Sequence, residues 1–163
     1  MQEAPVFLSL GSNQGDREFF LSRAREEIAT IAGKILSVSS VYETEAWGND
    51  ELQPFLNQAL EIETDLAPEV LLKALLEIEQ SLGRERTDIP WQARTIDIDI
   101  LFYGKLDLKT PALLLPHPFI QDRKFVLMPL AEIAGNWTHP RFGKTIQELL
   151  ESCPDSLGIR KTG

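Results

Sequence analysis

Hydrophobic and polar residues follow one another in blocks that predict a strand and then a helix at the start of the chain. Val6 to Leu10 is a short apolar run that ends in the glycine-containing loop 11–16, which is typical of a buried strand. Four apolar residues then recur at helical spacing: Leu21, Ala24, Ile28 and Ile31. Asp16 is the expected cap of this helix and Gly33 its expected end.

The alternation then continues through two strands, a second helix and a fourth strand. Ile35 to Tyr42 and Phe55 to Glu63 both alternate with a period of two residues, which favours strands. Pro68 suits the first turn of a helix, and Gly83 would end it. The apolar face of this helix consists of Leu71, Leu75, Ile78 and Leu82. Arg94 to Tyr103 is the predicted fourth strand.

The order β-α-β-β-α-β predicts an α+β fold of the ferredoxin-like plait type, an α/β sandwich. Its four-stranded antiparallel sheet would carry the two main helices on one face and leave the other face free. The remaining sequence indicates a small hairpin, two short helices and a loosely ordered tail. The hairpin would pair Leu106–Leu108 with Leu113–Leu115. The two helices would be Asp122–Ala134 and Thr145–Ser152, and the tail would be Ser156–Gly163. We expect residues 1–163 to form a single domain.

Two carboxylates interrupt the apolar fourth strand. Side chains alternate along a strand, so Asp97 and Asp99 share one face, roughly 6.6 Å apart along the chain direction. Two neighbouring acids repel each other, and a hard cation such as Mg²⁺, usually accompanied by phosphate, is a natural partner. A lone Asp-x-Asp more often marks a strand with one wet face, but the nearby arginines and histidine favour a metal–polyphosphate site.

Composition narrows the range of functions. The net charge of −9 argues against nonspecific nucleic-acid binding and makes the arginines at 84, 86 and 94 a local anion site. The chain has no apolar run long enough for a membrane span and no secretory signal at its start. The single cysteine, Cys153, fits a reducing cytosol, so we expect a cytoplasmic protein, and a single unfused domain suggests a monomer.

Two segments look like phosphate loops but fit the pattern poorly. Gly143-Lys144-Thr145 resembles the end of a P-loop, yet Thr138 stands where a glycine is needed, so Thr145 is better interpreted as a helix cap. The loop from Gly11 to Gly15 follows a strand and precedes a helix, but it lacks a dinucleotide-binding fingerprint.

Several motifs together resemble 6-hydroxymethyl-7,8-dihydropterin pyrophosphokinases, enzymes of folate biosynthesis. The resemblance runs from Leu10-Gly11-Ser12-Asn13 to Met128-Pro129-Leu130-Ala131-Glu132 and rests on motifs in the family order. They are Phe55-Leu56-Asn57, Gly83-Arg84-x-Arg86, Trp91-x-x-Arg94-Thr95-Ile96-Asp97-Ile98-Asp99, Pro116-His117-Pro118 and Arg123-x-Phe125-Val126-Leu127-x-Pro129. The resemblance implies the same plait and transfer of the β,γ-diphosphate of ATP to the pterin hydroxymethyl group.

The resemblance also implies roles for individual residues. Asp97 and Asp99 match the pair that holds two Mg²⁺ ions and, with Arg84 and Arg94, form the catalytic group. The matched contacts to the co-substrate ATP are Glu79, Arg84, Arg94, His117 and Arg123. The matched pterin contacts are Thr44, Trp47, Phe55, Asn57, Trp91, Asp97 and Phe125. Relatives commonly carry a tyrosine at the position of Phe55, so this chain would lack a hydroxyl contact there.

Segment 83–94 carries three of these residues and is expected to close over the site when both substrates bind. Two other functions remain open. A different Mg²⁺-dependent phosphotransferase would keep the aspartates and arginines but would not need a slot for a planar ring. A non-catalytic plait that binds a small molecule would show no turnover to lose when Asp97 is replaced.

Overall fold

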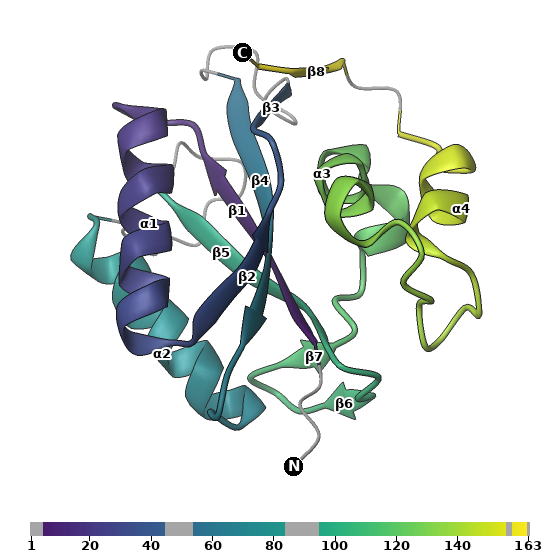
Figure 1. Cartoon of the computed structure of the whole chain (residues 1–163), viewed down its shortest axis with the longest axis horizontal. Coiled ribbons are helices and arrows are strands. Elements are labelled where there is room, and N and C mark those ends of the chain that lie inside the picture. Colours follow the sequence, from purple (N-terminus) through teal and green to yellow (C-terminus); the bar gives the residue numbers. More distant parts are fainter. Residues whose placement is uncertain (1–4, 45–53, 84–94, 156–157, 163) are drawn as a thin grey trace.

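The computed structural model describes residues 5–44, 54–83, 95–155 and 158–162, and Figure 1 shows a central sheet with helices on both sides. The predictions for Trp47, Trp91, Arg84, Arg94 and the closing segment fall on residues outside these ranges. Among the described residues, no helix is long and apolar enough to cross a membrane.

The six strands of the main sheet pair antiparallel throughout. They are β1 (Val6–Ser12), β2 (Lys34–Val38), β3 (Tyr42–Thr44), β4 (Phe55–Glu63), β5 (Asp97–Tyr103) and β8 (Ile159–Lys161). Their order is β5-β1-β4-β3-β8, and β2 also pairs with β4. The predicted first, third and fourth strands are β1, β4 and β5, so the order in space is that of the ferredoxin-like plait.

Helices α1 (Arg17–Ile31) and α2 (Pro68–Ser81) cover one face of the sheet, as predicted. Alternate residues of β1, β4 and β5 enter a core with both helices. The strands contribute Leu8, Leu10, Leu60, Ile98 and Ile100, and the helices contribute Leu21, Ile28, Leu71 and Leu75. Asp16 caps α1 by accepting a hydrogen bond from the Phe19 amide, and Gly83 ends α2 with a φ of 95°. Ile31, expected in the apolar stripe of α1, is 44% exposed.

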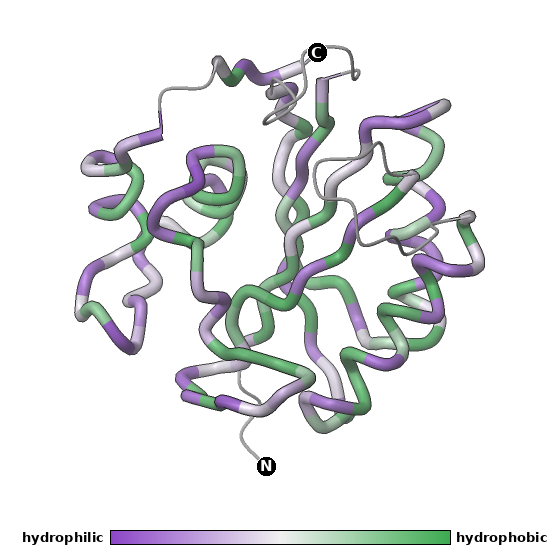
Figure 2. The backbone as a smooth tube through the Cα atoms, turned by 180° about the vertical axis from the view of Figure 1, so that it is seen from behind, coloured by the Kyte–Doolittle hydropathy of each residue, from purple (hydrophilic) through white to green (hydrophobic). Residues whose placement is uncertain are grey.

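The face expected to be free is partly covered. Helices α3 (Lys124–Ala134) and α4 (Ile146–Glu151) pack on it and form a second core with β1, β4 and β5. The strands contribute Phe7, Ala59, Leu101 and Phe102, and α3 contributes Leu127 and Leu130. Figure 2 shows hydrophobic residues along the central strands and alternating with hydrophilic ones along the helices. The sheet is therefore the middle layer of three, and only part of its second face is open.

Other differences from the sequence prediction have physical causes. The second predicted strand divides into β2 and β3 because Glu132 of α3 accepts hydrogen bonds from the backbone and side chain of Ser40. The tail is not loose at residues 159–161, since β8 pairs with β3. Helix α3 begins at Lys124, after the 3₁₀ turn η1 (Ile120–Asp122), so Asp122 is not part of it.

The connection between β5 and α3 contains the predicted hairpin in a shorter form. It consists of β6 (Leu108–Lys109) and β7 (Leu114–Leu115), which pair antiparallel. Thr145 caps α4 through a capping box with Glu148, which confirms the prediction that Thr145 is a helix cap.

Candidate active site

Strand β5 presents the two aspartates on the face that α1 and α2 do not cover. Ile96, Ile98 and Ile100 are at most 3% exposed and lie in the core beneath these helices. Asp97 and Asp99 alternate with them and are both partly exposed. The predicted division of the strand into an apolar and an acidic face is confirmed.

Glu79 of α2 supports β5 from the helix side. Its side chain is 2% exposed, and Oε2 accepts a hydrogen bond of 2.6 Å from the amide of Ile98, the residue between the two aspartates. The predicted ATP contact of Glu79 remains a prediction. The structure shows that this carboxylate fixes the backbone that carries Asp97 and Asp99.

A β-bulge in β5 leaves a backbone acceptor for the segment that carries His117. Leu8 of β1 pairs with Ile100 and Phe7 pairs with Phe102, so Leu101 has no partner residue on β1. The carbonyl of Leu101 instead accepts a hydrogen bond of 3.0 Å from the amide of His117. The Pro116–Pro118 turn, which follows a cis Leu115–Pro116 bond, is thereby docked onto β5.

The imidazole of His117 is prepared to donate a hydrogen bond. Its Nδ1 accepts from the amide of Phe119 at 3.3 Å, so the proton of the neutral ring is on Nε2. Burial, followed by the positive charge of Arg123, lowers the pKa of His117 to about 4, while Asp97 acts in the opposite direction. Near neutral pH the ring is therefore an uncharged donor.

Arg123 and Phe125 lie together at the beginning of α3. The guanidinium carbon of Arg123 is 5.0 Å from the ring centre of Phe119 and 5.8 Å from that of Phe125. Aromatic faces of this kind hold a guanidinium in place and leave its N–H groups available at the edges. The predicted phosphate contact and the predicted aromatic wall are thus immediate neighbours.

A second group of predicted residues lies in one row across the sheet. Asp97 of β5 pairs with Gly11 of β1, and Gly11 pairs with Asn57 of β4. Two interstrand steps of about 4.8 Å place the Cα atoms of Asp97 and Asn57 about 10 Å apart, with a residue that lacks a side chain between them. A Cβ atom at Gly11 would lie 3.3 Å from Asn57 Oδ1, so the glycine keeps this slot open.

The amide of Asn57 has a fixed orientation. Its Nδ2 donates a hydrogen bond of 2.8 Å to Thr44 Oγ1, and both residues are at most 6% exposed. Thr44 pairs with Phe55, the partly buried first residue of β4. A Cβ atom at Gly11 would be 3.7 Å from the Phe55 ring, so the ring borders the same slot.

The structure thus brings two groups of predicted residues together, with Asp97 common to both. One group lies on and beside β5 and consists of Asp97, Asp99, His117, Arg123 and Phe125. The other lies around Gly11 and consists of Asp97, Asn57, Thr44 and Phe55. Gly11 stands in a loop and in the motif Leu10-Gly11-Ser12-Asn13, but the sequence assigns it no role, because a glycine offers no side chain to interpret. Its place at the end of a buried strand was the available signal.

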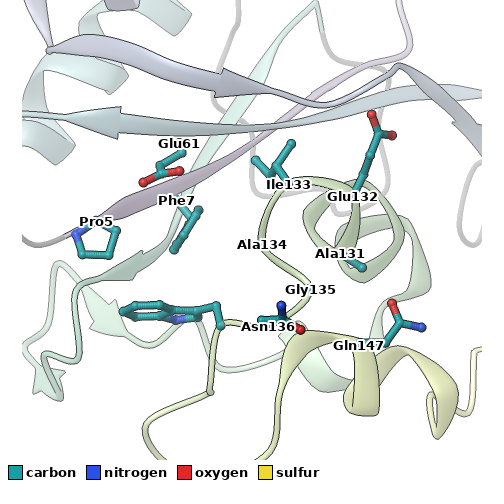
Figure 3. A pocket seen from close by; sticks show the side chains of 11 residues that line it. Pro5, Phe7, Glu61, Ala131, Glu132, Ile133, Ala134, Gly135, Asn136 and Gln147 are labelled. Atoms are coloured by element: carbon teal, nitrogen blue, oxygen red, sulfur yellow. The ribbon is translucent and has the colours of Figure 1, made fainter.

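Of two hollows on the described surface that differ in size, the smaller one belongs to the predicted site. Asp99, His117 and Pro118 line a pocket of about 290 Å³, together with Leu72, Ile98 and residues of the β6–β7 connection. A wider hollow of about 710 Å³ lies between α3 and the other end of β1 and β4, where Phe7, Glu61, Ile133 and Gln147 line it (Figure 3). None of the predicted site residues lines this wider hollow.

The donor set fits Mg²⁺. The carboxylates of Asp97 and Asp99 are hard oxygen donors on a rigid strand, and Mg²⁺ is commonly held by one or two carboxylates with substrate phosphates and water completing the shell. No group of three or more histidine, cysteine or acidic side chains converges as a metal cage within the described ranges. The two carboxylates of Asp97 and Asp99 therefore fit the kind of site in which the protein shares the ion with substrate phosphates.

The ferredoxin-like sheet, the paired aspartates and the adjoining aromatic–amide slot fit the class of ATP-binding pyrophosphokinases. The family model for 7,8-dihydro-6-hydroxymethylpterin-pyrophosphokinase matches residues 7–135. The chain belongs to this family of folate biosynthesis, as the sequence motifs predicted.

Curated relatives agree with this assignment. The 2-amino-4-hydroxy-6-hydroxymethyldihydropteridine pyrophosphokinase of Methylorubrum extorquens is 41% identical over 157 residues, covering 96% of this chain and 97% of the relative. The Aquifex aeolicus enzyme of the same name is 40% identical, covering 89% of each chain. The Bacillus subtilis enzyme of that name is 44% identical over 78% of this chain and 77% of its own length.

The fold is also that of larger solved proteins. An HPPK-DHPS structure in complex with substrates has a TM-score of 0.74 and 17% identity, covering 93% of this chain. Plasmodium falciparum wild-type HPPK-DHPS with pterin and p-hydroxybenzoate has a TM-score of 0.72 and 17% identity, covering 93% of this chain. This chain spans 43% and 42% of their respective lengths, and at these identities the likeness shows the fold alone.

Proposed function

We propose that the protein transfers the β,γ-diphosphate of ATP to the hydroxymethyl group of 6-hydroxymethyl-7,8-dihydropterin, giving AMP and the pterin diphosphate. The observation that carries this proposal is the position of Asp97. It lies at once in the row Asp97–Gly11–Asn57, which suits a planar ring, and beside Asp99 and His117, which suit a polyphosphate. A reaction between the two substrates requires such a common point.

Asp97 and Asp99 would hold two Mg²⁺ ions. When bound, these ions would neutralise phosphate charge and increase the acidity of the pterin hydroxyl group. The contribution of the protein is to keep both carboxylates on one face of β5, with Glu79 fixing the Ile98 amide between them. Phosphoryl-type transfer depends mainly on such positioning and on charge stabilisation.

His117 and Arg123 would contact the ATP phosphates. The neutral ring of His117 can donate from Nε2, and Arg123 can donate in a fork that matches phosphate oxygens. The pocket of about 290 Å³ that includes His117 and Asp99 would accept part of the nucleotide. The catalytic roles of Arg84 and Arg94 remain predictions from the sequence.

The slot around Gly11 would accept the pterin. Because Nδ2 of Asn57 already donates to Thr44, Oδ1 is directed toward Gly11 and can accept from ring N–H groups. Phe55 and Phe125 would pack against the ring, and an offset or edge-to-face contact suits aromatic groups. Trp47 and Trp91 would complete the pterin contacts, as the sequence predicts. We further propose that the enzyme acts as a cytoplasmic monomer.

A product assay tests the proposal. The protein is incubated with ATP, Mg²⁺ and 6-hydroxymethyl-7,8-dihydropterin, and the nucleotides are separated by chromatography. AMP that appears only with the pterin, in equal amount to pterin diphosphate, is the expected result. ADP would indicate a single-phosphoryl transfer and overturn the proposal, as would the absence of any nucleotide change.

A further inference from the structure

Glu43 of β3 is held by arginines from two distant parts of the chain. Arg17 Nη1, at the beginning of α1, lies 3.1 Å from Glu43 Oε2, and Arg160 Nη2 of β8 lies 2.5 Å from Glu43 Oε1. Arg17 Nη1 also donates a hydrogen bond of 2.7 Å to the carbonyl of Pro54. We call these four residues, Arg17, Glu43, Pro54 and Arg160, the Glu43 clamp.

The clamp lies directly behind the proposed pterin slot. Thr44 is the last residue of β3 and pairs with Phe55, the first residue of β4. Glu43 and Pro54 are their immediate neighbours in the chain. Glu43 pairs with Leu56, whose side chain enters the core under α1 and α2. Glu43 therefore points to the helix face, whereas Thr44 and Asn57 point to the slot.

The position of β3 depends on contacts from outside the strand. It has only three residues, and its pairing with β4 is limited to three residue pairs. On its other side it pairs with β8, where Glu43 is directly opposite Arg160. Opposite charges at such a cross-strand pair favour this register. Arg160 lies beyond residues 7–135, which the family model matches.

The carboxylate of Glu43 pairs with two arginines, of which Arg17 is partly buried and Arg160 is largely exposed. The Glu43 side chain is 18% exposed, and that of Arg17 is 23% exposed. The hydrogen bond from Arg160 is the largest influence that lowers the pKa of Glu43, with Arg17 adding to it against the effect of burial. The carboxylate is therefore ionised near neutral pH and able to bind both partners.

We propose that Arg17 and Arg160 are positioning residues for pterin binding. This role rests on the proposed function. The clamp fixes the spacing between Thr44 and Phe55 from behind the sheet, and Thr44 in turn orients the Asn57 amide. None of the clamp side chains needs to touch the substrate. Because the proposed pterin contacts depend on this spacing, loss of the clamp should weaken pterin binding measurably.

The test compares Arg17→Met with Arg23→Met. Both residues belong to α1, but Arg23 pairs only with Glu26 and Glu27 of the same helix among the described contacts. We expect Arg17→Met to raise the KM for the pterin by roughly tenfold, which corresponds to about 1.4 kcal/mol. The KM for ATP and kcat should stay within about twofold, and Arg23→Met should change none of the three.

Further variants separate positioning from general loss of structure. Arg17→Lys should recover part of the pterin KM, and Glu43→Gln should raise it by severalfold. In a double-mutant cycle, Arg17→Met combined with Glu43→Gln should cost less than the two single changes together. An additive result, or equal changes in both KM values, would overturn the proposal.

A readout without turnover keeps this inference distinct from the proposed reaction. The side-chain ¹H–¹⁵N signal of Asn57 should shift in Arg17→Met and stay in place in Arg23→Met, with no substrate present. An unshifted Asn57 signal would overturn the clamp even if the wild-type protein produces AMP. A wild-type protein without AMP production would overturn the reaction, whatever the NMR result.

Discussion

The two outer regions of the sheet use charge in opposite ways. Around β5, Asp97 and Asp99 are partly exposed, the neighbouring His117 is uncharged near neutral pH, and Arg123 faces aromatic rings. Around β3 and β8, Glu43 is enclosed between two arginines of the same chain. The first region leaves charged and donor groups for the substrates and ions of the proposed reaction, whereas the second uses charge to hold the backbone.

The largest expected effect distinguishes these two uses directly. Asp97→Asn should lower kcat by about 10³-fold or more, because it removes charge where the phosphate and metal charges meet. Glu43→Gln should leave kcat nearly unchanged and alter only the KM for the pterin. Steady-state kinetics with saturating Mg²⁺ measures both, and Asp65→Asn serves as an exposed acidic control on the helix side. Equal losses of kcat in Asp97→Asn and Glu43→Gln would break the comparison.

Gly11→Ala tests the open slot between the two regions. A Cβ atom 3.3 Å from Asn57 Oδ1 requires that amide to move, and it occupies the space proposed for the ring. We expect the Kd for the pterin to rise by roughly tenfold, or about 1.4 kcal/mol, while the Kd for a nonhydrolysable ATP analogue stays the same. Calorimetry with each ligand gives the two values. An equal effect on both ligands would show that the slot is not specific to the pterin.

Glu79→Leu tests how the strand with the aspartates is held. The amide of Ile98 would lose its buried acceptor, which should lower the free energy of unfolding by about 1–3 kcal/mol. Glu79→Gln keeps an acceptor oxygen and should lose less. Urea denaturation measures both variants. If Glu79→Gln destabilises the protein as much as Glu79→Leu, the charge of Glu79 matters more than its hydrogen bond to Ile98.

Thr44→Val sharpens the account of the other region. It removes the hydroxyl that accepts from Asn57 Nδ2 and preserves the shape of the side chain. The pterin affinity should fall by roughly threefold to tenfold, about 0.7–1.4 kcal/mol, the usual net value of one hydrogen bond. Thr44→Ser keeps the hydroxyl and should bind almost normally. Weak pterin binding by Thr44→Ser would assign the effect to packing.

The smallest effect is a change in proton binding without a mutation. The pKa of His117 and that of His139 are both lowered to about 4, chiefly by burial and then by a nearby arginine. Binding of a Mg²⁺-bound ATP analogue should raise the pKa of His117, because phosphate charge favours the imidazolium form. His139 should not respond. NMR titration of both rings measures their pKa values. An unchanged pKa of His117 would show that its ring does not contact the phosphates.

The same two histidines make stability depend on pH. Because their pKa values are lower in the folded protein than the ordinary value of about 6.5, the unfolded chain binds more protons between pH 4 and 6.5. The contribution of the neutral rings to the free energy of unfolding is complete above about pH 6.5 and is lost as the pH falls through this window.

Local patterns in the sequence were sufficient for the plait and for the aspartates. The alternation in Phe55–Glu63 and in residues 96–100 determines which residues face the helices, and the structure confirms both assignments up to the bulge at Leu101. The division of the second strand was not visible, because it depends on Glu132, which is 92 residues from Ser40 in the chain. Strand β8 was missed for the same reason, since its partner is β3.

The site was predictable where a side chain carries the chemistry. Asp97, His117 and Asn57 could be found from motifs, and the structure places Asp97 and Asn57 on the predicted face. Gly11 also stands in a motif, but its role could not be predicted, because it acts through an absent side chain. The Glu43 clamp was missed because the residues that hold Glu43, Arg17 and Arg160, are 26 and 117 positions away.

The two hydrophobic cores on opposite faces of the sheet share no buried residue. Such separation favours cooperative units that open independently. Native-state hydrogen exchange should therefore find one opening free energy for amides of α1 and α2 and a lower one for those of the shorter α3 and α4. Arg123 and Phe125 belong to α3 or its boundary, so the wall they form would loosen before the strand that holds the aspartates does.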